Sequence, residues 1–266
     1  MKIKNEYYYR NRKNKIIVLI CQLSIFILTI IAWELLSYFN IIDSFLFSSP
    51  IKIAKLFFKY IKTFEIFEHI YISLIETILG IIFGTIIGLS VAVVLWWNKF
   101  LAKIFDPFLV ILNALPKTAL APIIIIWVGT GIKGITVVAI SISLIVTIMS
   151  AYSYFMMVDE EKIKMLKTFG ANKFQILFKL ILPSNFTNII NIIKINIGMS
   201  WVGVIVGEFI VSRAGIGYLI VYGSQVFKMD LVMMGVIVLA IISYFMYAFV
   251  NIFENRLKGK RRKWKN

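Results

Sequence analysis

The 266-residue chain has few charged residues, one cysteine and one histidine. Charged types make up 16% of it, against about 25% in a typical soluble protein, whereas apolar types make up 60%. A single globular core of this length could not bury so much apolar surface. The composition therefore excludes most soluble classes and indicates an integral membrane protein.

The scarcity of cysteine and histidine also excludes several kinds of site. Cys21 is alone, so neither an intramolecular disulfide nor a cluster of cysteine ligands can form. His69 is the only histidine, which excludes a zinc site built on two histidines, and no nucleophile motif accompanies it. We therefore expect no catalytic residue, no metal site and no cofactor.

Of two nucleotide-binding motifs, one occurs without the surrounding pattern that it needs, and the other does not occur. Residues 129–134 fit G-x-G-x-x-G, but Ser153 stands about 20 residues further on, where the dinucleotide fold needs an acid. Apolar segments flank the motif, so a turn between two helices explains it better. No Walker A sequence occurs, and the chain cannot bind and hydrolyse ATP by such a loop.

The apolar residues fall into six long runs. A helix needs about 20 apolar residues to cross the hydrocarbon core, and the alternating pattern of a membrane β-barrel is absent. The first run is too long for a signal peptide, and no small-residue cleavage site follows it. We predict an all-α integral membrane protein with about six transmembrane helices, over residues 16–39, 70–97, 105–128, 135–155, 189–211 and 231–253.

The basic residues predict the orientation of these spans. There are 29 Lys and Arg residues against 13 acids, and most of them fall on the side that carries both termini. By the positive-inside rule that side is the cytoplasm. The chain then consists of a basic cytoplasmic N-terminus (1–15), a transmembrane domain (16–255) and a basic cytoplasmic tail (256–266). Next to an apolar helix, this tail is expected to contact anionic membrane lipid rather than nucleic acid.

Several small or ionisable residues lie inside the predicted spans. Gly80, Gly84 and Gly88 recur every four residues, a spacing that lets a neighbouring helix approach closely. Polar residues in a membrane mark substrate pathways, and the candidates for a translocation pathway are Lys117, Ser200, Trp201 and Glu208. Glu34 and Glu76 are expected to pair with basic residues of the bundle.

Lys117 is the most informative of these candidates. It lies between Pro116 and Pro122, where a broken helix would free backbone groups to line a cavity. A lysine in such a place suits an anionic solute. It could equally snorkel or cap the break, and both interpretations stay open.

One long polar segment, residues 156–188, interrupts the spans on the predicted cytoplasmic side. Gly170 divides it, and Pro183 ends its second half. The second half carries apolar residues with helical spacing, which predicts one apolar face formed by Phe174, Leu177, Phe178 and Ile181. We predict a helix, a glycine turn and a second helix outside the bilayer.

This segment resembles a known signature. Gly170, nine intervening residues and Leu180-Ile181-Leu182-Pro183 match the second half of E-A-A-x3-G-x9-I-x-L-P, which marks permease subunits of binding-protein-dependent ABC importers. The resemblance extends over most of the chain. Segments similar to the nitrate/sulfonate/taurine branch of that family are 47–50, 115–129, 200–208, 215–220 and 230–232.

The resemblance implies a type I (MetI-like) permease bundle with a cytoplasmic coupling helix pair. It implies docking of a separate ATPase subunit on the coupling loop, through Lys164, Met165, Leu166, Gly170, Leu180, Leu182 and Pro183. The E-A-A positions hold Lys164, Met165 and Leu166, so a cation replaces the family's glutamate. Either the partner's groove differs there, or the acids just upstream, at positions 159–161, serve instead.

The same resemblance implies an import permease without catalysis of its own. Its partners would be the ATPase, an extracytoplasmic solute-binding protein and a second copy of the chain. The solute would be a small anion such as a sulfonate, nitrate or taurine, or alternatively a pyrimidine precursor of thiamine. A stand-alone channel or secondary carrier is the other alternative; it would need no docking loop, and an inverted repeat would support it.

Overall fold

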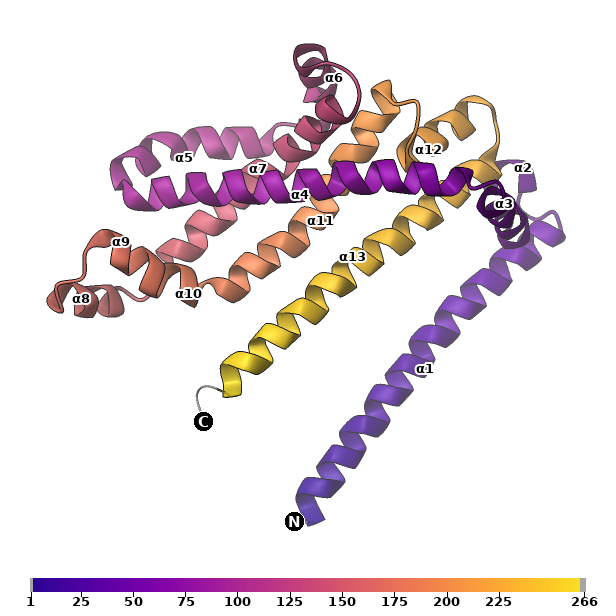
Figure 1. The fold of residues 1–266 in the computed structure, drawn as a ribbon. Coiled ribbons are helices and arrows are strands. Elements are labelled where there is room, and N and C mark those ends of the chain that lie inside the picture. The colour runs from indigo at the N-terminus through magenta and orange to yellow at the C-terminus, as the bar shows by residue number, and fades with distance from the viewer. Residues whose placement is uncertain (1, 264–266) are drawn as a thin grey trace.

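The computed structural model describes residues 2–263, with side chains over 16–257, and these residues form helices joined by short turns without any strand (Figure 1). The predicted basic N-terminus 1–15 and most of the tail 256–266 lie outside the part whose side chains are described. In chain order the elements are α1 (Lys2–Tyr38), α2 (Ser44–Phe47), α3 (Pro50–Lys62), α4 (Glu65–Trp97), α5 (Lys99–Ala114), α6 (Lys117–Val128), α7 (Ile132–Met156), α8 (Glu160–Thr168), α9 (Lys173–Ile176), the π-helical turn η1 (Leu177–Ile181), α10 (Leu182–Ser184), α11 (Phe186–Val211), α12 (Ile216–Gln225) and α13 (Met229–Lys263).

The helical content and the number of spans agree with the prediction. In the described residues, five helical stretches are long and apolar enough to cross a membrane. The predicted third span is different, because it consists of α5 and α6, which meet at an angle of 98°. The break falls at Leu115 and Pro116, and Pro116 directly precedes α6. A proline there cannot donate the backbone hydrogen bond that would continue α5.

The bundle has two ends that matter for function (Figure 1). One end carries the short helices α8, α9 and α10, and we call it the α8 end. The opposite end carries α2, α3 and α12, and we call it the α12 end. The start of α1 and the last residues of α13 both point away from the α12 end.

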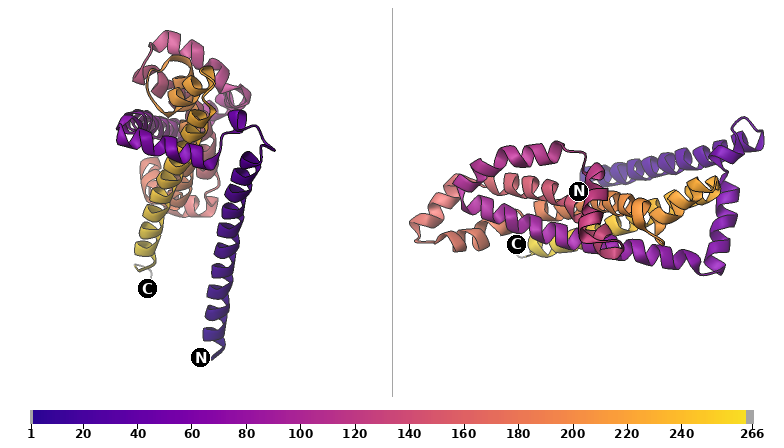
Figure 2. Two further views of the ribbon diagram at one scale, coloured as in Figure 1. Left: turned by 90° about the vertical axis from the view of Figure 1, so that its right-hand side faces the viewer. Right: turned by 90° about the horizontal axis from the view of Figure 1, so that it is seen from above.

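α1 stands apart from the rest of the chain (Figure 2). Its apolar stretch Ile16–Tyr38 is exposed almost throughout, and Ser37 is its buried residue. It approaches the remaining structure only near its end, where α2 and α3 begin. Its apolar surface is therefore available to lipid or to another chain.

The centre of the bundle is the packing of α4 against α7 and α11. The glycines at every fourth position of α4 allow the close approach of a neighbouring helix that the sequence predicts, and in the structure this helix is α7. The facing pairs are Gly80–Ala139, Gly84–Ser143 and Gly88–Thr147. A Cβ at Gly80 would lie only 2.8 Å from the Ala139 Cβ, so the close approach of the helices requires glycine.

A buried polar network lies beside this glycine stripe. The Asn196 side chain on α11 donates hydrogen bonds of 2.9 Å to the hydroxyls of Thr85 on α4 and Thr147 on α7. All three residues are buried. Because the amide links three helices, it fixes their register in a core that is otherwise apolar.

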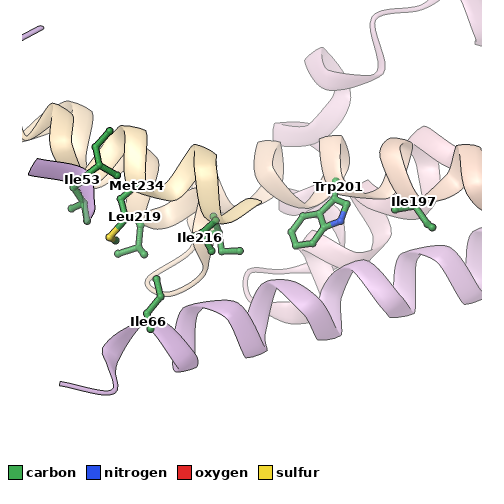
Figure 3. Close-up of a cluster of buried hydrophobic side chains, with 9 residues drawn as sticks. Ile53, Ile66, Ile197, Trp201, Ile216, Leu219 and Met234 are labelled. Carbon is green, nitrogen blue, oxygen red and sulfur yellow. The ribbon is translucent and has the colours of Figure 1, made fainter. Parts of the chain in front are cut away.

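A second buried cluster joins the α12 end to the rest of the bundle (Figure 3). Trp201 of α11 packs in it with residues of α12 and α13 such as Leu219 and Met234. Ile66, at the start of α4, also contributes. Through this apolar contact, α12 is held against the long helices instead of extending away from them.

An ion pair links α11 to α13 on another side of the bundle. The Lys194 ammonium lies 2.5 Å from the Glu254 carboxylate and 2.9 Å from the Asn251 amide oxygen. Its ammonium also lies 5.4 Å from the centre of the Tyr247 ring. Both charged side chains are largely buried, so each satisfies the other's charge.

Candidate functional site

The segment that the sequence predicts as a coupling loop forms a helix, a glycine turn and a second helical stretch at the α8 end. Asp159 caps α8 by accepting a hydrogen bond from the Glu161 N–H. Gly170 follows the helix with φ of +77°, in the left-handed region, as predicted. The N–H groups of Gly170 and Ala171 bond back to the carbonyls of Lys167 and Leu166, which is the Schellman ending of a helix.

The second half of the segment is less regular than predicted. Asn172 and Gln175 form a capping box that starts α9. The helix then widens into the π turn η1 before Pro183. Pro183 has no N–H for the carbonyl of Lys179, so an ordinary α-helical turn cannot close there.

The predicted single apolar face of this half is wrong. Leu177 and Ile181 are buried, together with Ile176. Phe174 and Phe178 instead are exposed and contact each other, with ring centres 4.5 Å apart. The wide turn η1 changes the angular position of successive residues, so a pattern based on 3.6 residues per turn fails across it.

The buried half of the segment ties it to the membrane helices. One apolar cluster contains Ile176, Leu177 and Ile181 with residues from the ends of the long helices α4, α7 and α11. Among these are Trp96 and Phe155. Three of the predicted docking residues pack against this cluster as partly buried side chains: Leu166, Leu180 and Leu182. They hold the segment in place, and Pro183 is exposed next to them.

α8 presents two different faces. Glu160, Ile163, Lys164 and Lys167 share one face and line a cavity against the ends of α4 and α5. On the opposite side lie Lys162, Met165 and Phe169, which we call the outer face of α8; Phe169 is its C-cap. Met165 is 53% exposed and Phe169 is 80% exposed. Lys164, which stands at the family's glutamate position, therefore faces inward, and Met165 faces outward.

The buried carboxyl group of Glu208 organises the α12 end. Its Oε1 accepts a hydrogen bond of 2.5 Å from the Ser73 hydroxyl on α4. Its Oε2 accepts one of 2.5 Å from the N–H of Gly217 in the first turn of α12. A carboxylate at this position satisfies a helix N-terminus, where N–H groups lack partners within the helix.

The residues around Glu208 complete the joint between α4, α11 and α12. The Ser73 hydroxyl also accepts a hydrogen bond from the Ile216 N–H, and His69 Nδ1 accepts one from the Gly215 N–H. Gly215 has φ of +121°. A Cβ at Gly215 would collide with the carboxyl of Glu208, so the turn must be glycine. This explains why the glycine-rich segment 215–217 follows Glu208 at a short distance.

The expected ion pairs of Glu34 and Glu76 are wrong. Glu76 is buried in side-chain hydrogen-bonding contact with Glu208, and its Oε2 has no partner within the described structure. Glu34 accepts a hydrogen bond of 3.0 Å from the N–H of Ile51 at the start of α3. Glu34 therefore serves a helix end and Glu76 contacts another acid, and among the described side chains no lysine or arginine forms an ion pair with either of them.

The remaining pathway candidates lie in different surroundings. Ser200 and Trp201 are buried on α11, and the serine hydroxyl and indole N–H have no hydrogen-bond partner among the described residues. Lys117 begins α6 at the break, and its ammonium lies 3.1 Å from the Asn113 side-chain oxygen and 3.4 Å from the Asn113 carbonyl. Lys117 thus bridges the end of α5 and the start of α6. Its part in a pathway stays a prediction.

Two segments that carry the sequence resemblance meet at the α12 end. Ser48 donates a hydrogen bond of 2.6 Å to Asp230, 182 residues further along the chain. Ser48 has φ of +55°, and Ser49 caps α3. The short motifs 47–50 and 230–232 are therefore parts of one structural joint between α2, α3 and α13.

These features define a class of protein. The bundle spans a membrane several times, carries a compact helix pair anchored to the ends of its spans, and shows no metal-ligand cluster in the described residues. That is the architecture of a transport permease. The chain belongs to the family described as binding-protein-dependent transport system inner membrane component, whose profile matches residues 80–259.

Relatives support the same assignment. SsuC of Bacillus subtilis, a permease protein named for aliphatic sulfonates transport, is 26% identical over 88% of this chain and 83% of its own length. The taurine transport system permease protein TauC of Escherichia coli is 24% identical over 72% of this chain and 70% of its own. The formylaminopyrimidine transport permease protein ThiX of Halalkalibacterium halodurans is 24% identical over 90% of this chain and 94% of its own length.

A solved structure supports the fold. A chain of the MetNI methionine ABC transporter, in an inward-facing conformation, superimposes with a TM-score of 0.64 at 17% identity, over 74% of this chain and 95% of that one. The predicted family and MetI-like fold are thus confirmed. This chain is a multi-pass inner-membrane permease of a binding-protein-dependent ABC importer of the sulfonate and taurine type, which works with an ATPase and a binding protein.

Proposed function

We propose that this permease translocates a small anionic solute, such as a sulfonate, taurine or nitrate, into the cell. ATP hydrolysis is the work of the separate ATPase, and this chain supplies no catalytic residue. The names of SsuC and TauC support the choice of solute. The anchored helix pair at the α8 end supports the coupling to ATP.

The observation that carries the proposal is the outer face of α8. Met165 and Phe169 expose apolar side chains outside the bundle, flanked by the charged residues Asp159, Glu161 and Lys162. An apolar centre with a charged rim is typical of a protein interface, whereas a face inserted in lipid would lack such charges. We assign this face to the ATPase.

The buried side of the same segment would transmit the movement. Ile176, Leu177 and Ile181 pack on the ends of α4, α7 and α11, so a displacement of α8 displaces these spans as well. ATP-driven closure of two ATPase subunits would then move two permease copies relative to each other and open the pathway alternately to either side. In this arrangement the second copy is another molecule of this chain.

The proposal also fixes an orientation. The α8 end, the N-terminus and the C-terminal tail lie in the cytoplasm, and the α12 end meets the extracytoplasmic binding protein. The excess of lysine and arginine on the cytoplasmic side supports this placement. The pathway residues in this account are Lys117, Ser200, Trp201 and Glu208, since polar groups within a membrane bundle mark such routes.

A pyrimidine precursor of thiamine is the second candidate solute. The similarity to ThiX extends over nearly the full length of this chain and of ThiX itself, and the name of ThiX refers to formylaminopyrimidine. This alternative requires the same coupling segment and differs only in the solute. Uptake into vesicles that contain the permease, its ATPase and its binding protein decides between the two, with radiolabelled taurine and formylaminopyrimidine as competing probes.

Capture of the ATPase tests the docking face. We expect Phe169→Asp to abolish co-purification of the ATPase subunit with the permease. The matched control is Phe227→Asp, which also places an acid at an exposed phenylalanine, but at the α12 end. Equal capture by both variants would contradict the assignment of the outer face of α8.

A further inference from the structure

A cavity of about 670 Å³ lies at the α8 end, between the inner face of α8 and the junction of α4 with α5. Trp96 and Trp97 end α4 on one side of it, and the first residues of α5 follow them. The face of α8 that lines it is opposite to the proposed docking face. The ATPase assignment therefore leaves this cavity without an occupant.

The lining of the cavity is strongly basic. Four lysines contribute to it, from α5, α8 and α9: Lys99, Lys164, Lys167 and Lys173. Glu160 is the one acid among the described residues that line it. The described side chains form two ion pairs, Lys162–Asp159 and Lys194–Glu254, and neither of them involves a lysine of the cavity. Like charges so close together repel each other, so this arrangement favours a bound anion.

Part of this basic site is held in a fixed geometry. The Lys173 ammonium donates a hydrogen bond to the Trp97 carbonyl and lies 5.4 Å from the centre of the Trp97 ring. Lys164 and Lys167 are neighbours one turn apart on α8, which itself packs through Ile163 on the buried cluster. The N-terminus of α5, a helix of 16 residues, adds the positive end of its dipole.

The position of the cavity identifies the source of the anion. Trp96 and Trp97 end a span of 33 residues, and tryptophans at the end of a span lie at the level of the lipid headgroups. Lysines beside them reach the same level. Basic pockets at the cytoplasmic ends of membrane helices bind anionic headgroups, and the cytoplasmic leaflet supplies such lipids.

We propose that this cavity binds the phosphate of an anionic phospholipid headgroup. The lipid neutralises the lysines of α5, α8 and α9 together and holds α8 against the ends of α4 and α5. The position of the coupling segment, and so the efficiency of coupling, depends on anionic lipid. The binding step itself does not depend on the identity of the transported solute.

Native mass spectrometry of the full-length permease, released from detergent with phosphatidylglycerol or phosphatidylcholine, measures this binding. The wild type is expected to retain phosphatidylglycerol in preference to phosphatidylcholine. Lys164→Gln/Lys167→Gln should bind phosphatidylglycerol about thirtyfold more weakly, since each of the two lysines at a lipid surface contributes on the order of 1 kcal/mol and about 1.4 kcal/mol corresponds to a factor of ten. Retention equal to that of the wild type would overturn the proposal.

Two further variants distinguish the loss of charge in the cavity from a general loss of positive charge on the protein. Lys162→Gln/Lys179→Gln removes the same charge from exposed lysines outside the lining and should bind as the wild type does. Lys164→Arg/Lys167→Arg keeps the charge and should retain the lipid. If both controls lose the lipid to the same extent as the glutamine variant, the cavity is not the site. Should the glutamine variant fail to fold, Lys99→Gln/Lys167→Gln takes its place.

A titration with inorganic phosphate shows whether the cavity binds a phospholipid headgroup or free phosphate. We expect millimolar phosphate to leave the phosphatidylglycerol adduct in place. Displacement of the lipid by phosphate, with a phosphate adduct that the glutamine variant lacks, would overturn the lipid assignment in favour of a free anion.

Discussion

Ser73 on α4 and Glu208 on α11 lie 135 residues apart in the chain and share a buried hydrogen bond of 2.5 Å. The same carboxyl group receives the N–H of Gly217, so one side chain joins three helices. Substrate movement in such a bundle requires helices that move as connected bodies. The Glu208 joint makes α12 part of the body formed by α4 and α11.

Removal of the Glu208 carboxyl group should weaken this joint. Glu208→Ala leaves the Ser73 hydroxyl and the Gly217 N–H buried without an acceptor. We expect the free energy of unfolding to fall by about 2–4 kcal/mol, measured by denaturation in detergent micelles. Glu208→Gln keeps an acceptor oxygen and should lose clearly less. An alanine variant as stable as the wild type would show that the hydrogen bonds of Glu208 do not contribute to the free energy of unfolding.

Gly203 on α11 tests the packing of the central helices. A Cβ there would overlap the Ala139 backbone and lie 2.9 Å from its nitrogen, and backbone cannot move aside as a flexible side chain can. We expect Gly203→Ala to reduce the free energy of unfolding by about 1–3 kcal/mol.

Gly198 is the matched control for that substitution, because it lies on the same helix with nothing within 4 Å of its Cβ position. Gly198→Ala should leave stability unchanged or raise it by up to about 1 kcal/mol, since alanine favours a helix more than glycine does. Equal losses at positions 198 and 203 would indicate a general effect of alanine on α11 instead of a specific overlap.

Substitutions at Gly170 test the effect of backbone conformation without any effect of steric crowding. Nothing lies within 4 Å of its Cβ position, so its left-handed φ alone requires glycine. Gly170→Asn should keep the turn, because asparagine tolerates this conformation, whereas Gly170→Val should cost about 1–2 kcal/mol. Limited proteolysis within residues 156–188 and ATPase capture measure the effect. Identical behaviour of the two variants would contradict this explanation.

Much of this architecture follows from the sequence, for a physical reason. The spans are set by the length of apolar runs, and the α4–α7 contact by glycines on one helix face. Gly170 requires glycine because of its own backbone conformation. Each of these signals is local, and each is found in the structure.

The remaining features depend on contacts between distant residues or on irregular backbone. The partner of Glu208 lies 135 residues away, and the expectation that Glu76 pairs with a base failed because its neighbour is another acid. Phe178 lies within the π turn η1, which no regular periodicity predicts, and its side chain is exposed. Pro116 marks a break in the third span, but its 98° angle depends on the packing around it.

The Lys194–Glu254 pair should show what a buried ion pair contributes to stability. Lys194→Met removes the ammonium that lies 2.5 Å from the Glu254 carboxylate and is expected to lower the free energy of unfolding by about 3 kcal/mol. The double variant Lys194→Met/Glu254→Met removes both charges and should recover most of that loss. Chemical denaturation of the two single variants and the double variant gives the coupling energy. A double variant no more stable than Lys194→Met would contradict a direct pairing.

The central claim is that this chain conducts a solute inward only when an ATPase drives it through the outer face of α8. ATP-dependent uptake of radiolabelled taurine into vesicles containing the permease, its ATPase and its binding protein tests this most directly. We predict uptake that requires ATP and all three components, and its loss in Phe169→Asp. Uptake by the permease alone, without ATP, would contradict the account and identify a stand-alone carrier.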